Sequence, residues 1–387
     1  MKKSVVLFIL LSGVKTSNAQ WEITSGPTEP NVTVLAAKEN LLLAGCASAS
    51  NSLGGYRTFN QGDNWAPIGT MLISKFNSLE IDQSNDVVYA GGLNCFYKST
   101  DNGNTFTNTN AGLSPYIVRD IFIDGNNLYT SCQGVYLSTN GGLNWSLNSP
   151  VFSSTKMDKS GNVILVGSLN GGVRFSLNNG VSWTNVTAGI PTTIADVKII
   201  GTNFFIATPF GLYTSSNNGI GWAVTDLDIN VNSLHLVNST LFAGCDDGVY
   251  FSSNNGISWN FSNSGLTNST VFSITSDSTY LYAGTTGYVF RKALAEFGVL
   301  TSNNNNQNQF ALEDFSVLST NGVLAISKKE AANSFLNIYS IDGKKIKSLV
   351  FNEITKQIDL SYLTKGIYII QIFSENGKSF NRKFILN

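Results

Sequence analysis

The chain has 387 residues, of which 42% are hydrophobic and 13% are charged, and its formal net charge is −1. This length fits one large domain or two modest ones, and the abundance of Gly, Asn, Ser and Thr is typical of turn-rich all-β proteins. Residues 20–300 hold 11 Lys and Arg against 18 Asp and Glu, so nucleic acid is a poor partner for this part.

Residues 1–19 have the pattern of a secretory signal peptide. Lys2 and Lys3 precede the apolar run SVVLFILLSGV, and the small residues SNA stand before Gln20. The apolar run is too short to span a membrane, and no Cys follows the cleavage point to carry a lipid. We therefore predict export with cleavage after Ala19, and no membrane span in the rest of the chain.

A short phrase, a hydroxyl residue followed by Asn or Asp, Gly and a closing aromatic, recurs six times between residues 58 and 259. Its period of about 40 residues matches one four-stranded propeller blade. The Asx side chain can hold a tight turn and the Gly supplies positive φ, so each phrase predicts a hairpin between the third and fourth strands of a blade. The defining residues are Asn60, Gly62, Trp65, Asp101, Gly103, Phe106, Asn140, Gly142, Trp145, Asn178, Gly180, Trp183, Asn217, Gly219, Trp222, Asn254, Gly256 and Trp259.

First strands outnumber the phrases by one. They begin near Val32, Phe76, Val118, Phe152, Ile194, Val231 and Val271. The seventh blade, 271–293, lacks a last strand, whereas WEITSGP (21–27) reads as the tail of a phrase without its head. We predict that residues 21–25 form the outer strand of the last blade and close a seven-bladed β-propeller over residues 20–300.

The C-terminal part reads as a second domain. Residues 301–309, TSNNNNQNQ, form a polar low-complexity linker with nothing to bury. Residues 310–387 alternate apolar and polar side chains at strand period, with the turn signals IDGKK and SENGKS between runs. They predict a small β-sandwich of roughly seven strands, similar in size to an immunoglobulin-like domain.

Two family resemblances follow from these residues. The six phrases resemble Asp-box (BNR) repeats, which implies a propeller with the boxes at the blade periphery, although only Asp101 has the Asp of the family name. The stretches LNIYSIDGKKI, IDLSYLTKGIYIIQI and GKSFNRKFILN resemble the type A C-terminal sorting domain of the type IX secretion system of Bacteroidetes. That resemblance implies export through the outer membrane, recognition by the translocon, removal by a sortase-like enzyme, and a protein released or attached to the cell surface.

The functional groups of a propeller are expected at the mouth of its central channel, on the first strands. Aligning the seven first strands gives a first column of Val34, Ser78, Asp120, Ser154, Asp196, Ser233 and Ser273, and a second of Ala36, Glu80, Phe122, Lys156, Lys198, His235 and Thr275. Asp120 and Asp196 could form the carboxylate pair of a glycoside hydrolase. We favour the alternative that the polar residues hydrate a narrow channel. The predicted ligand-binding residues are Arg119, Asp120, Asp196, Lys198 and His235.

Known propeller chemistries find little support. A sialidase needs three Arg, yet of the four in the propeller only Arg119 lies near a first strand, the others being Arg57, Arg174 and Arg291. Xyloglucanases of this class use two propellers. His235 is the only histidine and no metal-ligand or cofactor motif occurs, so we expect neither a metal nor a cofactor.

Four cysteines, Cys46, Cys95, Cys132 and Cys245, are too few for a disulfide scaffold. Their positions in neighbouring blades leave one disulfide possible, either Cys95–Cys132 or Cys46–Cys95, and Cys245 is expected to be a buried thiol. The sequence thus favours a secreted, non-catalytic propeller that binds a glycan, peptide or protein. A divergent glycoside hydrolase is the alternative, and an assembly or adhesion factor is a third reading.

Overall fold

The structure is a computed structural model that describes residues 20–28, 31–47, 54–68, 76–93, 95–113, 117–299, 315–320, 323–328, 333–340, 344–364, 366–374 and 379–386. The predicted signal peptide, 1–19, and the predicted linker, 301–309, lie outside the described residues. The chain divides into two compact units, one up to Thr301 and one from Ser302, and each is described by itself.

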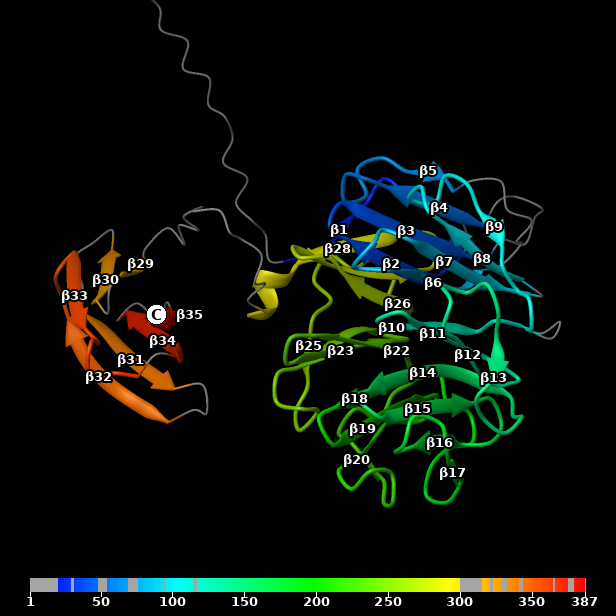
Figure 1. Ribbon diagram of the computed structural model, residues 1–387. Coiled ribbons are helices and arrows are strands. Elements are labelled where there is room, and N and C mark those ends of the chain that lie inside the picture. Colours follow the sequence, from blue (N-terminus) through cyan, green and yellow to red (C-terminus); the bar gives the residue numbers. More distant parts are fainter. Residues whose placement is uncertain are drawn as a thin grey trace, which may run out of the picture. The chain divides into compact units, whose positions relative to one another are not determined.

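The first unit contains seven four-stranded antiparallel sheets, which confirms the predicted seven-bladed propeller (Figure 1). Six of them take their strands consecutively from the chain. Blades 1 to 3 are β2 (Val32–Lys38), β3 (Leu41–Cys46), β4 (Gly55–Thr58) and β5 (Ala66–Pro67); β6 (Phe76–Ile81), β7 (Val88–Gly92), β8 (Cys95–Ser99) and β9 (Thr107–Asn108); and β10 (Asp120–Asp124), β11 (Asn127–Cys132), β12 (Gly134–Ser138) and β13 (Ser146–Leu147).

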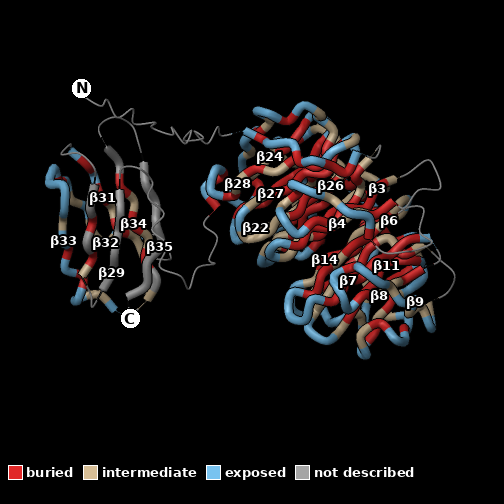
Figure 2. Tube along the Cα trace, turned by 90° about the horizontal axis from the view of Figure 1, so that it is seen from above, coloured by how far each residue is buried: buried red, intermediate tan, exposed pale blue. Residues whose placement is uncertain are grey.

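Blades 4 to 6 repeat this order. They are β14 (Ser154–Ser160), β15 (Val163–Ser168), β16 (Val173–Ser176) and β17 (Thr184–Val186); β18 (Asp196–Ile200), β19 (Asn203–Thr208), β20 (Gly211–Ser215) and β21 (Ala223–Val224); and β22 (Val231–Val237), β23 (Thr240–Cys245), β24 (Gly248–Ser252) and β25 (Asn260–Phe261). Middle strands are buried along most of their length and the turns are exposed, as Figure 2 shows. The apolar side chains pack between neighbouring sheets.

The seventh blade joins both ends of the unit, as predicted. Its sheet is β26 (Val271–Ser276), β27 (Tyr280–Thr285), β28 (Val289–Ala293) and then β1 (Glu22–Ile23). β1 lies antiparallel beside β28, with Glu22 opposite Arg291 and Ile23 opposite Phe290 (Figure 1). β1 thus covers the edge of β28, and the first strands of blades 1 and 7 contact each other, so the ring is closed at this junction.

Each repeated phrase forms the predicted turn between the third and fourth strands. The hydroxyl of its first residue accepts the N–H of the Gly four positions on, at 2.8–3.2 Å in all six blades. The Asx Oδ1 accepts the N–H four residues after itself, at 2.8–3.0 Å. The Gly has positive φ, and so does the residue before it, for example Asn255 (57°) and Gly256 (77°). Asn and Asp therefore fulfil the same role in this turn.

Blade 7 has no such phrase after its third strand. There the 3₁₀ helix η1 (Leu294–Phe297) follows β28. Phe297 packs edge-on against Trp21, with ring centroids 6.1 Å apart, and against Phe242. The helix therefore covers the strand that closes the ring.

The second unit is a sandwich of seven strands, as predicted. One sheet has the order β29 (Phe315–Thr320), β30 (Val323–Lys328), β33 (Thr355–Asp359), and the other β32 (Lys345–Phe351), β31 (Ser334–Ser340), β34 (Gly366–Ser374), β35 (Ser379–Leu386). Residues from both sheets, among them Leu324, Ile326, Ile338 and Ile370, form one buried cluster. This is the packing of an independent small domain.

All four cysteines are buried and unbridged, so neither of the two disulfides left open by the sequence is formed, and Cys245 is the buried thiol that was expected. Cys95 and Cys132 belong to different apolar clusters on either side of blade 2, and Cys46 belongs to a third. Burial raises the pKa of the Cys95 and Cys132 thiols to about 11. These cysteines are therefore small apolar packing groups.

Candidate functional site

The seven first strands surround a cavity of about 300 Å³ at the centre of the ring. Every blade contributes to its wall. The wall contains Asp120, Asp196, Lys198 and His235 of the predicted ligand-binding set, together with Glu80 and Lys156. Arg119 precedes β10 and is not among the lining residues, and Ser154 is not among them either.

Strand register corrects one position in each predicted column. The turn between the first and second strands gives a common reference point in each blade. The last paired residues before it are Asp124 and Asn127 in blade 3, Ser160 and Val163 in blade 4, and Ile200 and Asn203 in blade 5. Lys156 is therefore level with Asp120 and Asp196, and Asp158 is level with Phe122 and Lys198. The prediction that placed Ser154 in the first column and Lys156 in the second is wrong by two residues.

The inner acids bind the next blade. Asp120 Oδ2 accepts the Met157 N–H at 2.9 Å, and its Oδ1 lies 2.9 Å from Lys156 Nζ. Asp158 Oδ2 accepts the Ile199 N–H at 2.7 Å. A carboxylate that accepts a backbone N–H of a neighbouring sheet fixes the two sheets relative to each other.

The same kind of bond continues around the ring. Asp196 Oδ2 accepts the Leu234 N–H at 2.7 Å, and Ser233 Oγ accepts the Ile274 N–H at 3.3 Å. Ser273, Thr33 and Asn77 donate to backbone carbonyls of the following blade, at 3.2, 3.4 and 3.2 Å. All seven junctions thus carry a bond from an inner-strand side chain, so these residues do more than hydrate the channel.

Two acids of the cavity are held partly protonated near neutral pH. Enclosure, and next the charge of Asp120, raises the pKa of Glu80 to about 7. Enclosure also raises the pKa of Asp196 to about 6, against the opposing effect of Lys156. Enclosure lowers the pKa of His235 to about 3, with Lys198 adding to the effect, so this imidazole is neutral. Its Nε2 lies 2.9 Å from Ser276 Oγ.

The predicted site set omitted two inner acids, Asp158 and Glu80, of which Glu80 lines the cavity. Among the described residues it has no ion-pair partner, whereas Asp120 lies beside Lys156 and Asp158 lies 3.4 Å from Lys198 Nζ. Its position in the second column was visible in the sequence, where it is the only acid. The signal that could have selected it is the absence of a base at the same level in either neighbouring blade.

We expect the substitution Glu80→Gln to change the pH dependence of stability. The folded state binds an additional proton at Glu80 between the ordinary pKa of 4.5 and about 7, so the free energy of unfolding falls as pH rises through this range. At pH 8 the Gln variant should be more stable than the wild type by about 1 to 2 kcal/mol, allowing for water in the cavity. At pH 4.5 the two should be equal. Urea unfolding at both pH values measures this difference, and equal stability at pH 8 would contradict it.

The described part of the chain shows no group of three or more His, Cys, Asp and Glu side chains that could hold a metal ion. It also contains no helix with the length and hydropathy of a membrane span. The three arginines of the propeller other than Arg119 lie on the blades. Arg57 bonds Asn102 and Asn104, Arg174 stacks on Phe152, and Arg291 pairs with Asp63.

Comparison with protein families identifies the second unit. Residues 320–387 match the secretion system C-terminal sorting domain, which confirms the predicted type IX sorting domain. This domain implies export of the chain to the cell surface or extracellular space and interaction with the type IX machinery. No curated protein sequence matches the chain.

Solved structures of similar fold include surface and extracellular proteins. PorZ, a surface component of the type IX secretion system of Porphyromonas gingivalis, is 13% identical with a TM-score of 0.56, covering 94% of this chain and 60% of its own. The extracellular domain of the putative two-component system BT3049 of B. thetaiotaomicron is 12% identical with a TM-score of 0.56, covering 95% and 57%. YCF48 bound to D1 peptide is 15% identical with a TM-score of 0.56, covering 72% and 96%. At these identities the likeness shows the fold alone, and the chain spans less than two thirds of PorZ and BT3049.

Proposed function

We propose that the propeller is a secreted or surface-attached binding module whose ligand is a peptide or protein segment that enters the central channel. The observation that carries this proposal is the polar cavity of about 300 Å³, lined by all seven blades. A cavity of this size admits one or two side chains rather than a folded domain. A peptide ligand is also what the propeller YCF48 carries in its solved complex.

The charges of the cavity are suited to binding because most are already fixed. Lys156 and Lys198 are held by Asp120 and Asp158, and Asp196 accepts two backbone N–H groups. Preorganised groups lose little entropy when a ligand arrives. Glu80 is the acid left to pair with the ligand, and we place Asp120, Asp196, Lys198 and His235 around it as contact residues. Arg119, outside the cavity wall, could contribute only at the mouth.

A peptide array probed with the full secreted chain tests this proposal. Peptides that bind the wild type should bind Glu80→Gln about tenfold more weakly, because a charge-assisted bond becomes neutral. Glu39→Gln, at the exposed turn after β2, is the matched control and should bind as the wild type does. A glycan array run in parallel distinguishes carbohydrate ligands. Binding that ignores Glu80→Gln would contradict the role of the channel.

A glycoside hydrolase is the second candidate, and one observation favours it. A carboxyl group with a pKa of about 7, such as Glu80, suits a general acid. Asp120 and Asp196, the acids first considered for this role, are engaged with backbone N–H groups. Turnover of chromogenic glycosides that is lost in Glu80→Gln, Asp120→Asn or Asp196→Asn would establish hydrolysis.

The second unit, as a sorting domain, is expected to have partners of its own. We propose that the type IX translocon recognises it and that a sortase-like enzyme then removes it. The six hairpin turns belong, in our proposal, to the Asp-box class and have a structural role. Export of the chain by a type IX-competent strain, with a shorter extracellular product, would support the cleavage step.

A further inference from the structure

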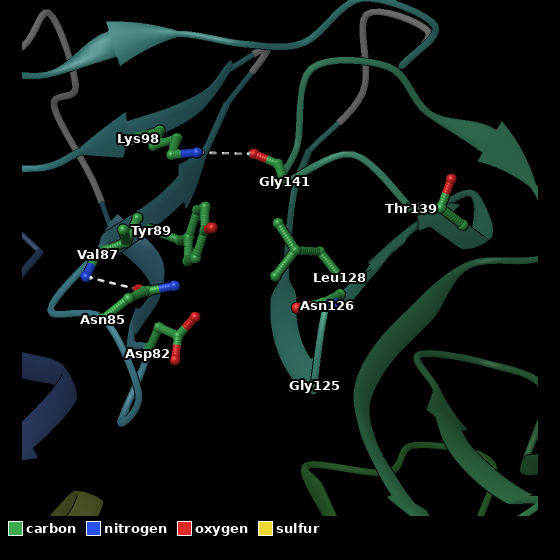
Figure 3. Close-up of a pocket in the computed structure, with 10 residues that line it drawn as sticks. All are labelled: Asp82, Asn85, Val87, Tyr89, Lys98, Gly125, Asn126, Leu128, Thr139 and Gly141. Carbon is green, nitrogen blue, oxygen red and sulfur yellow. Dashed lines mark hydrogen bonds between the residues drawn. The ribbon is translucent and has the colours of Figure 1, made fainter.

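A second cavity of about 300 Å³ lies between blades 2 and 3 (Figure 3). Asp82, Tyr89 and Lys98 form its wall on blade 2, and Gly125 and Leu128 are on the facing wall of blade 3. None of its lining residues lines the central channel. The two cavities are therefore separate sites.

The neighbouring junction shows what such a space can hold. Between blades 3 and 4, the ammonium group of Lys159 lies 2.6 Å from Asp124 Oδ2 and 2.6 Å from the carbonyl oxygen of Gly161. It also lies 5.7 Å from the centroid of the Tyr129 ring. The Lys159 side chain is only 6% exposed. A carboxylate, a carbonyl and an aromatic face thus bind a desolvated primary ammonium group.

Strand register places the same acceptors between blades 2 and 3. Tyr89 pairs with Glu80 as Tyr129 pairs with Phe122. Asp82 follows two residues after Glu80, as Asp124 follows Phe122. Asp82 and Tyr89 are therefore the counterparts of Asp124 and Tyr129.

The third acceptor is also present, but the lysine is not. Gly125 follows Asp124 in the hairpin as Gly161 follows Ser160, so it is the counterpart of Gly161. Ile123, which pairs with Leu128, occupies the position of Lys159, which pairs with Ile164. The junction between blades 2 and 3 thus has the acceptors of an ammonium group and a cavity in place of the group itself.

The charges at the two ends of this cavity differ in sign. Burial alone would raise the pKa of Asp82, but hydrogen bonds from Ser84 lower it, so the carboxyl is ionised. Lys98 donates to the Gly141 carbonyl at 3.2 Å, and its ammonium group lies 5.8 Å from the Tyr89 ring centroid. In Figure 3, Tyr89 lies between Lys98 and Asp82.

We propose that this cavity binds a small amino-carboxylate, an amino acid or similar zwitterion. Its ammonium group lies between Asp82 and the Gly125 carbonyl, over the Tyr89 ring, as that of Lys159 does one blade further on. Its carboxylate pairs with Lys98. The ligand thus supplies the ammonium group that Lys159 provides one blade further on and that Ile123 does not have.

Calorimetric titration of the full chain with glycine, 4-aminobutanoate and 6-aminohexanoate tests the proposal. At least one of these should bind, with an affinity at least about tenfold higher than that of hexanoate, which lacks the ammonium group, or of cadaverine, which lacks the carboxylate. Absence of binding by all three to the folded protein would overturn the proposal.

Ile123→Lys provides the sharpest variant because it restores the arrangement between blades 3 and 4. The new ammonium group should occupy the cavity and weaken binding about tenfold or more, whereas Ile123→Val should bind like the wild type. Asp82→Asn, which keeps the acceptor for Ser84, should also weaken binding if Ile123→Lys fails to fold. Glu80→Gln, in the central channel, should leave it unchanged. Affinity unchanged in Asp82→Asn, or lost in Glu80→Gln, would assign the ligand elsewhere.

Discussion

Replacing Trp21 by Ala is expected to lower the free energy of unfolding of the propeller by about 3 to 5 kcal/mol, the range for a large buried aromatic side chain. Trp21 is 3% exposed and packs on Phe297. Its Nε1–H donates to the Ser262 carbonyl at 2.7 Å, and its backbone N–H to that of Ser264 at 2.7 Å. The loss should be large because the side chain anchors the start of β1 to the segment that follows β25 of blade 6, next to the last blade.

Neighbouring substitutions separate closure from general packing. Ile23 lies on the same strand but is 53% exposed, so Ile23→Ala should change stability by less than about 0.5 kcal/mol. Trp21→Phe keeps an aromatic ring but loses the bond to Ser262, and an intermediate loss of about 1 to 2 kcal/mol is expected. Urea unfolding followed by circular dichroism measures all three. Equal midpoints for Trp21→Ala and Ile23→Ala would show that β1 does not hold the ring closed.

Local features of the propeller could be predicted from the sequence because they depend on residues close together in the chain. The hairpin phrases are such a feature, since Ser252, Asn254 and Gly256 bond within the turn itself. The closure was also predictable, although β1 and β28 are far apart in sequence. A blade without its last strand leaves an edge that some other segment must cover.

Contacts between blades were harder to predict, because they depend on register. In blade 4 the first strand begins with Ser154 at the position that Val32 and Val231 hold in blades 1 and 6. Without an apolar residue to mark that position, the predicted alignment started two residues too early, at Phe152, and missed Asp158. Gly167 could have corrected the alignment. Glycines of other second strands, such as Gly45 and Gly244, lie opposite the first-column residues Val34 and Ser233. The cavity between blades 2 and 3 likewise depends on register, because it brings Asp82 and Tyr89 of one blade opposite Gly125 of the next.

The disulfide state of the cysteines was left open by the sequence for a related reason. Cys95 and Cys132 belong to neighbouring blades. Cys95, however, packs in the apolar cluster between blades 1 and 2, and Cys132 packs in the cluster between blades 2 and 3. Sequence order around a ring therefore says less about side-chain contacts than the side of the sheet on which each residue lies.

Asp158→Ala is expected to cost about 3 kcal/mol, because it removes the acceptor of the Ile199 N–H and leaves the half-buried ammonium group of Lys198 without its nearest carboxylate. Asp158 is 6% exposed. It accepts the Ile199 N–H at 2.7 Å and lies 3.4 Å from Lys198 Nζ, whose pKa it helps to raise against the effect of enclosure. The substitution should therefore loosen blade 4 from blade 5.

Three further variants identify the cause of that cost. Asp158→Asn keeps an acceptor for Ile199 and should lose less than Asp158→Ala. Adding Lys198→Met to Asp158→Ala removes the unpaired charge and should recover part of the stability, as a double-mutant cycle would show. Asp86→Ala breaks the pair of Lys38 with a carboxylate that is 67% exposed and should cost at most about 1 kcal/mol. If Asp158→Ala costs no more than Asp86→Ala, the inner acids do not link the blades, and they would be free to serve the ligand or the chemistry of the channel.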